Sequence, residues 1–113
     1  IFVENDSKAL NILKKNLNNL KIEPQSKVVG EKIITFFNKL NNKDKFEIIF
    51  FDPPFAENFF VEELKKIKNS TIYRKKHLII IHRETKIKED LKKIINIFLV
   101  RDYGRSKLIF GSF

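Results

Sequence analysis

The stretch Phe46-Glu47-Ile48-Ile49-Phe50-Phe51-Asp52-Pro53-Pro54-Phe55 decides the fold of this chain. Its apolar part is short and rich in Ile and Phe, which is typical of a strand buried on both faces in a parallel sheet covered by helices. Asp52 is the first polar group after the strand. Pro53 and Pro54 lack a main-chain N–H and fix their own φ, and Pro54 also keeps Pro53 out of the helical region, so we expect an extended, rigid loop. The loop is either a preorganised clamp that presents a carboxylate, carbonyls and Phe55 at the carboxyl edge of the sheet, or a stiff turn between a strand and a helix.

The segment before this stretch predicts strand, helix, strand and helix. Residues 1–4 indicate the end of a buried strand, and Asp6 can cap the helix that follows. Residues 27–29 predict a short strand that bends at Gly30, and residues 32–40 predict a second helix. The first helix has an apolar stripe at three- and four-residue spacing, formed by Leu10, Leu13, Leu17 and Leu20.

The loop over residues 52–55 is called the proline loop below, and the segment after it begins with a third amphipathic helix. Residues 77–82 then predict an apolar strand, residues 89–95 a short helix, and residues 97–102 and 107–112 two strands around a turn at residues 103–105. Strand and helix alternate four times before this terminal antiparallel hairpin, so the predicted class is α/β with a mostly parallel sheet. The side chains expected to face inward are Phe60, Leu64, Ile67, Leu91, Ile94 and Ile95.

The charge of the chain favours a polyanionic partner. Its 113 residues include 23 Lys and Arg against 14 Asp and Glu, a formal charge of +9. Lysines that neutralise phosphates release counterions and supply affinity that does not depend on base sequence. A compositional explanation stays open, because an AT-rich coding sequence favours Lys, Asn, Ile and Phe whatever the function. The basic side chains that bracket the segment after the proline loop are Lys65, Lys66, Lys68, Arg74, Lys75 and Lys76.

Length and composition indicate one small domain. No linker, repeat or low-complexity segment divides residues 1–113. The chain starts at Ile1 within a strand pattern and contains no Met, so we expect the carboxyl-terminal part of a longer protein. The absence of Cys excludes disulfides and thiolate metal sites, and no apolar run approaches the roughly 20 residues of a membrane span. We therefore expect a cytoplasmic protein that does not enter a membrane.

A second acid also follows a predicted strand. Glu4 stands where the second strand of a nucleotide-binding fold holds the carboxylate that accepts hydrogen bonds from ribose hydroxyls. A helix cap is the simpler explanation for such an acid. In combination with Asp52 and the two prolines that follow it, Glu4 is more strongly indicated as the ribose acceptor.

At these positions the chain resembles the class I methyltransferases that use S-adenosylmethionine. In that group, Asp/Asn-Pro-Pro-Tyr/Phe after the fourth strand marks enzymes that methylate exocyclic amino groups of nucleobases. More closely, the chain is similar to the carboxyl-terminal two-thirds of the RsmD-type 16S rRNA guanine-N2 methyltransferases. The matching pieces are Val3-Glu4-Asn5-Asp6, Val28-Val29, Asp52-Pro53-Pro54-Phe55 and Tyr103-Gly104-Arg105-Ser106-Lys107-Leu108.

The resemblance implies a Rossmann-like fold in which residues 1–113 are a partial methyltransferase domain. The first strand and helix of the fold, with the glycine-rich cofactor turn, are expected before Ile1, so residues 1–113 alone should be unstable, aggregation-prone and inactive. The implied cofactor-binding positions are Glu4, Asn5, Glu31 and Lys32. The pair Glu31-Lys32 departs from the small polar residue that such enzymes often place near the adenine, which puts adenine contacts there in doubt.

The resemblance also implies a mechanism, with catalytic positions at Asp52, Pro53, Pro54 and Phe55. The Asp52 carboxylate and the Pro53 carbonyl would accept the two N–H groups of guanine N2 and turn its lone pair toward the methyl donor, with proton loss to Asp52 or water. Phe55 would stack on the extruded base, a contact worth about 1–3 kcal/mol. The implied partner is 16S rRNA or the small ribosomal subunit, bound by a monomer.

Other residues are weaker candidates. His77 and His82 bracket an apolar strand, a setting in which structural histidines outnumber catalytic ones, and no third ligand is spaced for a metal site. Tyr103 is expected to pack at the hairpin rather than to touch substrate.

Three alternative functions stay open. The tetrapeptide also fits an amino-methyltransferase that acts on another nucleobase, such as adenine N6 in DNA or RNA. A nicotinamide-dependent oxidoreductase would use Glu4 but gives no reason for a rigid Asp-Pro-Pro-Phe. A basic RNA-binding module without catalysis would use the loop only as a turn.

Overall fold

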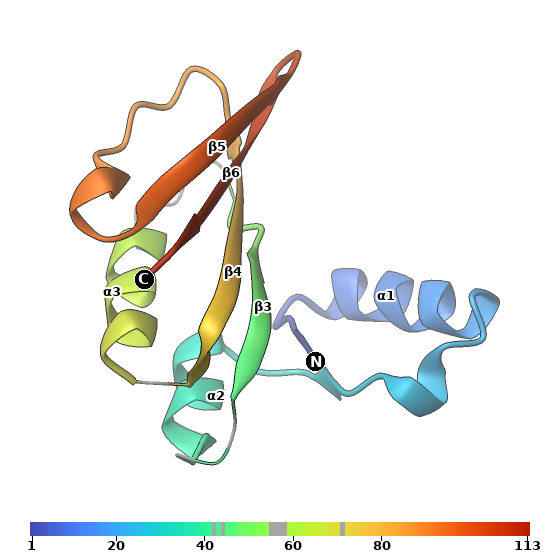
Figure 1. Cartoon of the computed structure of the whole chain (residues 1–113). Coiled ribbons are helices and arrows are strands. Elements are labelled where there is room, and N and C mark those ends of the chain that lie inside the picture. The colour runs from blue at the N-terminus through green and yellow to red at the C-terminus, as the bar shows by residue number, and fades with distance from the viewer. Residues whose placement is uncertain (42, 44, 55–58, 71) are drawn as a thin grey trace. The chain divides into compact units, whose positions relative to one another are not determined.

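Strands and helices alternate along most of the chain, as the sequence predicts (Figure 1). The computed structural model describes residues 1–41, 43, 45–54, 59–70 and 72–113. Its contacts divide the chain into two units, Ile1–Leu40 and Asn41–Phe113, and each unit is described by itself.

The first unit holds a parallel strand pair and two α-helices. Strand β1 (Phe2–Val3) pairs in parallel with β2 (Val28–Val29), so both strands have their carboxyl ends at the same edge. Between them come α1 (Ser7–Asn19) and the 3-10 turn η1 (Glu23–Gln25), and α2 (Ile33–Lys39) follows β2.

Helix α1 has the predicted N-cap and part of the predicted apolar stripe. The carboxylate of Asp6 accepts a hydrogen bond of 2.8 Å from the main-chain N–H of Ala9, which confirms the N-cap. The stripe is correct only in part, because Leu17 is buried while Leu20 is exposed. The helix ends at Asn19, and Leu20 is its C-cap residue. The helical spacing that predicts a buried position for Leu20 therefore no longer applies there.

The second unit is built on a mixed four-stranded sheet with the order β3-β4-β6-β5. Strands β3 (Phe46–Phe51) and β4 (Tyr73–Glu84) are parallel, and α3 (Phe60–Ser70) connects them. After the 3-10 turn η2 (Leu91–Lys93), strands β5 (Asn96–Tyr103) and β6 (Ser106–Ser112) form an antiparallel hairpin, and β6 pairs antiparallel with β4. The terminal hairpin is confirmed, but this sheet contains a single parallel pair and is not mostly parallel.

The core of the second unit lies where the sequence places it. The stripe of α3 is buried at Phe60, Leu64 and Ile67, each at most 1% exposed. The helix predicted over residues 89–95 is only the three-residue turn η2. The three apolar side chains that are expected to face inward are nevertheless buried, because a tight turn in front of β5 directs them to the same core. They are Leu91, Ile94 and Ile95.

Further expectations about exposure are wrong. The sequence predicts the end of a buried strand over residues 1–4, yet Phe2 of β1 is 41% exposed. The sequence predicts that β3 is buried on both faces, yet Ile48 is 62% and Phe50 57% exposed, while Phe51 is buried. Successive side chains of a strand point to opposite faces, and only the face of Phe51 is covered. Tyr103 does not pack at the hairpin either, because it is exposed beside Gly104, whose φ of 62° turns the chain.

No helix within the described part of the chain is both long enough and apolar enough to cross a membrane.

Candidate active site

The carboxyl ends of β3 and β4 bring Asp52 and His82 together. The parallel register pairs Phe51 with Ile81, so the next residue on each chain lies at the same level and on the same face of the sheet. His82 Nδ1 is 2.8 Å from Asp52 Oδ1. Because a carboxylate oxygen only accepts, Nδ1 carries the proton and donates it.

The two side chains differ in how tightly they are held. His82 is a residue of β4, which pairs with β3 on one side and with β6 on the other, and its side chain is 29% exposed. Asp52 follows the end of edge strand β3, and its side chain is 62% exposed. The imidazole is therefore the better anchored partner of this pair.

Arg83 points to the opposite face of β4 and is fully buried. Its Nε donates to Glu89 Oε1 at 3.0 Å and to Oε2 at 3.2 Å, and its Nη2 also pairs with Oε1. Its Nη1 donates to the main-chain oxygen of Pro54 at 3.2 Å, and its guanidinium carbon lies 4.4 Å from the ring centroid of Phe60. A buried guanidinium is tolerated when its charge and N–H groups are satisfied, as they are here.

These contacts occupy some hydrogen-bond acceptors of the proline loop and leave others without a described partner. Asp52 Oδ1 is occupied by His82, and the oxygen of Pro54 is occupied by Arg83. Within the described part of the chain, neither Asp52 Oδ2 nor the main-chain oxygen of Pro53 accepts a hydrogen bond. The loop thus retains two acceptors, one from a side chain and one from the backbone of the next residue. Phe55, the fourth predicted catalytic position, lies outside the described residues.

The predicted cofactor positions lie in the first unit. Glu4 follows β1, and its Oε1 accepts hydrogen bonds from the main-chain N–H groups of Asn5 at 2.7 Å and Asp6 at 2.8 Å. Glu31 comes two residues after β2 and forms an ion pair with Lys39. Because β1 and β2 are parallel, both acids follow strand ends at one edge, where α/β folds bind nucleotides.

The remaining two cofactor positions have different surroundings. Asn5 is exposed, and only its main-chain N–H is engaged by Glu4. Lys32 is the exposed N-cap residue of α2 and forms no side-chain cap hydrogen bond. Of the four positions, Glu4 is thus the one whose carboxylate is oriented by the backbone and retains an oxygen, Oε2, without a partner among the described residues.

Sequence reasoning missed the contacts of three residues: His82, Arg83 and Glu89. The sequence predicts a structural histidine at His82, but its ring contacts the principal catalytic candidate. A usable indication was present, since Asp52 and the pair His82-Arg83 both end apolar runs, and polar groups at the carboxyl ends of neighbouring parallel strands converge. Glu89 gave no comparable indication, because it stands at the start of the helix predicted over residues 89–95, where nothing in the sequence pairs it with Arg83.

His77 is a structural histidine, as the sequence predicts. Its Nδ1 is 2.8 Å from the oxygen of Arg74, and its Nε2 accepts a 2.9 Å hydrogen bond from the N–H of Phe113. Its ring also lies 4.4 Å from that of Tyr73. Among the residues that the structure describes, no group of three or more acids and histidines is arranged to hold a metal ion.

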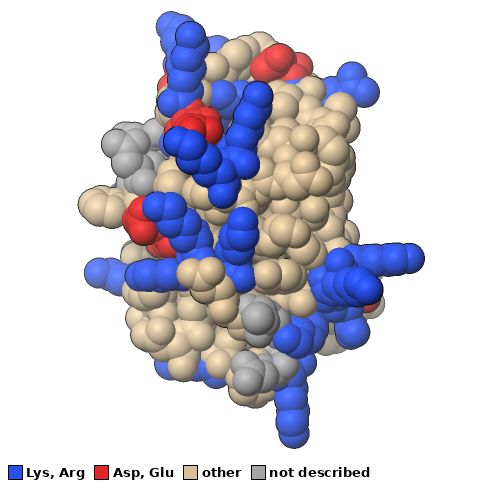
Figure 2. Space-filling view, turned by 60° about the vertical axis from the view of Figure 1, so that its left-hand side comes forward, with Lys and Arg blue, Asp and Glu red and all other residues tan. Residues whose placement is uncertain are grey.

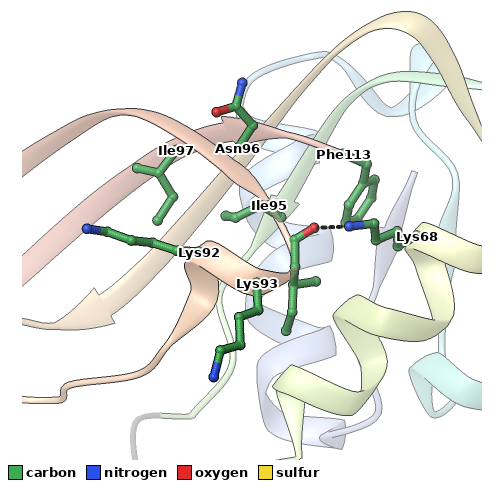
Figure 3. Close-up of a pocket in the computed structure, with 8 residues that line it drawn as sticks. Lys68, Lys92, Lys93, Ile95, Asn96, Ile97 and Phe113 are labelled. Atoms are coloured by element: carbon green, nitrogen blue, oxygen red, sulfur yellow. Dashed lines mark hydrogen bonds between the residues drawn. The ribbon is translucent and has the colours of Figure 1, made fainter.

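Among the charged side chains on the face shown in Figure 2, Lys and Arg are more prominent than Asp and Glu. A hollow of about 440 Å³ lies between α3, η2 and the start of β5, and its lysines are Lys68, Lys92 and Lys93. In Figure 3 they do not converge, because Lys92 and Lys93 project in different directions from η2 and Lys68 donates to the oxygen of Ile94 at 2.6 Å. This hollow is a basic surface rather than a specific anion site.

Comparison with solved structures defines the class of fold. A conserved hypothetical protein from Streptococcus pyogenes superposes with a TM-score of 0.85 at 20% identity, over 98% of this chain and 69% of that chain. A Haemophilus influenzae protein that carries the name "putative methylase" superposes with a TM-score of 0.76 at 22% identity, over 97% and 69% of the two chains. An Escherichia coli protein named "putative methyltransferase" gives 0.71 at 21% identity, over 96% and 59%. The chain therefore has the α/β fold of these proteins.

Comparison of sequences defines the family. The model of the family described as "Conserved hypothetical protein 95" matches residues 1–112, and the chain belongs to that family. Ribosomal RNA small subunit methyltransferase D from Haemophilus influenzae is 30% identical over 84 residues, which are 74% of this chain and 44% of that protein. These matches confirm the resemblance to the RsmD family. The chain spans less than half the length of this curated relative.

Proposed function

We propose that this chain is part of an S-adenosylmethionine-dependent RNA methyltransferase that methylates the exocyclic N2 of a guanine in 16S rRNA. The observation that carries the proposal is the pair of open acceptors at the carboxyl end of β3, Asp52 Oδ2 and the oxygen of Pro53. An exocyclic amino group has two N–H donors, and acceptors on two successive residues match them in number. The name of the 30% identical relative supports the choice of small-subunit ribosomal RNA.

In this proposal the loop activates the amine by orienting it. The lone pair of a ring-bound amino group is delocalised, so it attacks only when the group is turned toward the electrophile. Asp52 Oδ2 and the Pro53 oxygen accept one N–H each and set that orientation, which is the main contribution of a site that works by positioning. Asp52 then accepts the proton that the amine loses. Phe55 stays a prediction as the stacking residue for the extruded base.

The residues of the first unit suit the proposed cofactor. S-adenosylmethionine, when bound, supplies a methyl group activated by a sulfonium. Glu4 fits the ribose position, because two main-chain N–H groups orient its carboxylate and Oε2 can accept from a hydroxyl. Asn5, Glu31 and Lys32 are proposed to line the same site, and the ion pair between Glu31 and Lys39 makes Glu31 the weaker of the two acids for this role.

The basic surface suits an RNA partner. The formal charge of +9 supplies counterion release on binding phosphates. We propose 16S rRNA, alone or assembled in the small subunit, as that partner. Action as a cytoplasmic monomer stays a prediction from the sequence.

The test uses the full-length protein with tritiated S-adenosylmethionine and undermethylated 16S rRNA, both naked and assembled in small subunits. We expect label on guanine, identified as N2-methylguanine after nuclease digestion and chromatography. Label on adenine N6, in RNA or in a DNA control, would instead favour a different amino-methyltransferase. No label, together with no heat on titration of the cofactor, would favour a non-catalytic RNA-binding module.

A further inference from the structure

The contact between His82 and Asp52 restrains a side chain that little else holds. Asp52 is 62% exposed, and the described residues give its carboxylate one hydrogen-bond partner, His82 Nδ1 at 2.8 Å. An exposed aspartate otherwise rotates among its staggered rotamers. Without this contact, Oδ2 would have no fixed direction.

His82 is built to serve as an anchor. Its backbone belongs to β4, whose parallel ladder with β3 pairs Phe51 with Ile81 and whose antiparallel ladder pairs His82 with Leu108 of β6. The next residue, Arg83, holds the same loop through the oxygen of Pro54. Two successive residues of one central strand thus hold the loop from opposite faces, one at the carboxylate and one at the backbone.

We propose that His82 is the positioning residue of Asp52. Its Nδ1–H occupies Oδ1, which leaves Oδ2 as the oxygen that accepts the amino N–H and then the proton. This inference rests on the proposed methyl transfer and adds a residue that acts through Asp52 without touching the substrate itself.

The proposal makes a specific demand on the imidazole tautomer. The proton of a neutral ring must sit on Nδ1, because the carboxylate has none to give. Long-range ¹H–¹⁵N correlation spectra of histidine-labelled full-length protein at mildly alkaline pH report this tautomer without any need for activity. We expect the Nδ1–H form for His82 and its loss in Asp52→Leu. A predominant Nε2–H form in the unsubstituted protein would overturn the proposal.

Three substitutions separate positioning from bulk structure. His82→Leu keeps much of the volume and removes the donor, so kcat should fall about 10- to 100-fold, as expected for a displaced catalytic group. The KM for RNA and the Kd for S-adenosylmethionine should stay within about threefold, because in this proposal His82 acts only through Asp52. His82→Asn places an amide N–H near the position of Nδ1 and should recover most of kcat. His82→Gln places it near Nε2 and should not.

The matched control is His77→Gln, at the other histidine of β4. The described contacts of His77 are with Arg74, Tyr73 and Phe113, none of which belongs to the proline loop. Glutamine can still accept from the N–H of Phe113, so kcat should be unchanged. Thermal melting of each variant checks that it folds.

Two kinds of result would count against positioning. An active parent with an unchanged His82→Leu variant would refute positioning alone, as would equal losses in the Asn and Gln variants. A parent that transfers no methyl group would refute the proposed function, and this proposal with it.

Discussion

Arg83 donates from Nη1 to the main-chain oxygen of Pro54 at 3.2 Å while its own side chain is fully buried. The same guanidinium is held by the carboxylate of Glu89 and lies over the ring of Phe60 at the start of α3. Restriction of φ by the two prolines is therefore not the only constraint on the conformation of the proline loop. Its conformation also depends on a buried ion pair that joins it to β4 and to the segment before η2.

Breaking this pair should destabilise the protein strongly. Glu89→Gln or Arg83→Met leaves one buried group without its partner, and such losses cost about 3–5 kcal/mol. Chemical denaturation of the full-length protein measures the change in the free energy of unfolding. The double replacement Arg83→Met with Glu89→Leu should cost less than the sum of the single ones, because no unpaired charge remains.

The neighbouring surface pair provides the control. Lys93 and Asp90 form an ion pair of 3.1 Å with largely exposed side chains. Removing it with Lys93→Met should change the free energy of unfolding by less than about 1 kcal/mol. Similar losses at the buried and the exposed pair would contradict the role given to Arg83.

Replacing Asp52 should abolish methyl transfer without changing the affinity for S-adenosylmethionine. Asp52→Ala removes both the acceptor of the amino N–H and the acceptor of the proton, so we expect a loss of at least about 100-fold in transfer. Calorimetry should give nearly the parental affinity for S-adenosylmethionine. Asp102→Ala, an exposed acid of β5, is the matched control and should transfer methyl groups normally. Retained turnover by Asp52→Ala in a tritiated-methyl assay would contradict the catalytic role proposed for Asp52.

Residues 1–113 produced by themselves should aggregate. Edge strand β3 exposes Ile48 and Phe50, and an apolar edge is a template for pairing with another chain. Light scattering and size-exclusion chromatography should show large species, which Ile48→Lys with Phe50→Lys should reduce. A monodisperse sample of the unsubstituted chain with a cooperative melt would contradict this expectation.

Lysines on β4 should contribute to the salt dependence of RNA binding. Lys75 and Lys76 are consecutive and exposed. The slope of log affinity against log salt should become shallower by about 0.7 for each phosphate of single-stranded RNA that the protein no longer neutralises. Lys75→Gln with Lys76→Gln is compared with Lys14→Gln with Lys15→Gln on α1, which removes the same charge. Equal slopes for the two double variants would mean that only net charge matters.

Local patterns were enough to predict most elements. The buried stripe of α3, the N-cap at Asp6 and the terminal hairpin all follow from short-range spacing and from residues with strong local preferences. The exposure of Ile48 and Phe50 could not be predicted in this way, because an apolar run does not reveal which of its faces another element covers. The shortened helix before β5 belongs to the same class of error, since three apolar positions fit both a helix and a tight turn.

The sequence by itself determined the family and the principal candidate, because Asp52, Pro53 and Pro54 form a contiguous motif with restricted backbone conformations. Tertiary structure alone decided what surrounds that motif. His82 lies 30 residues from Asp52, and the two meet only because Phe51 and Ile81 are paired in the parallel ladder. A shift of one residue in that register would send His82 to the other face, so the partner of this candidate carboxylate is set by strand pairing.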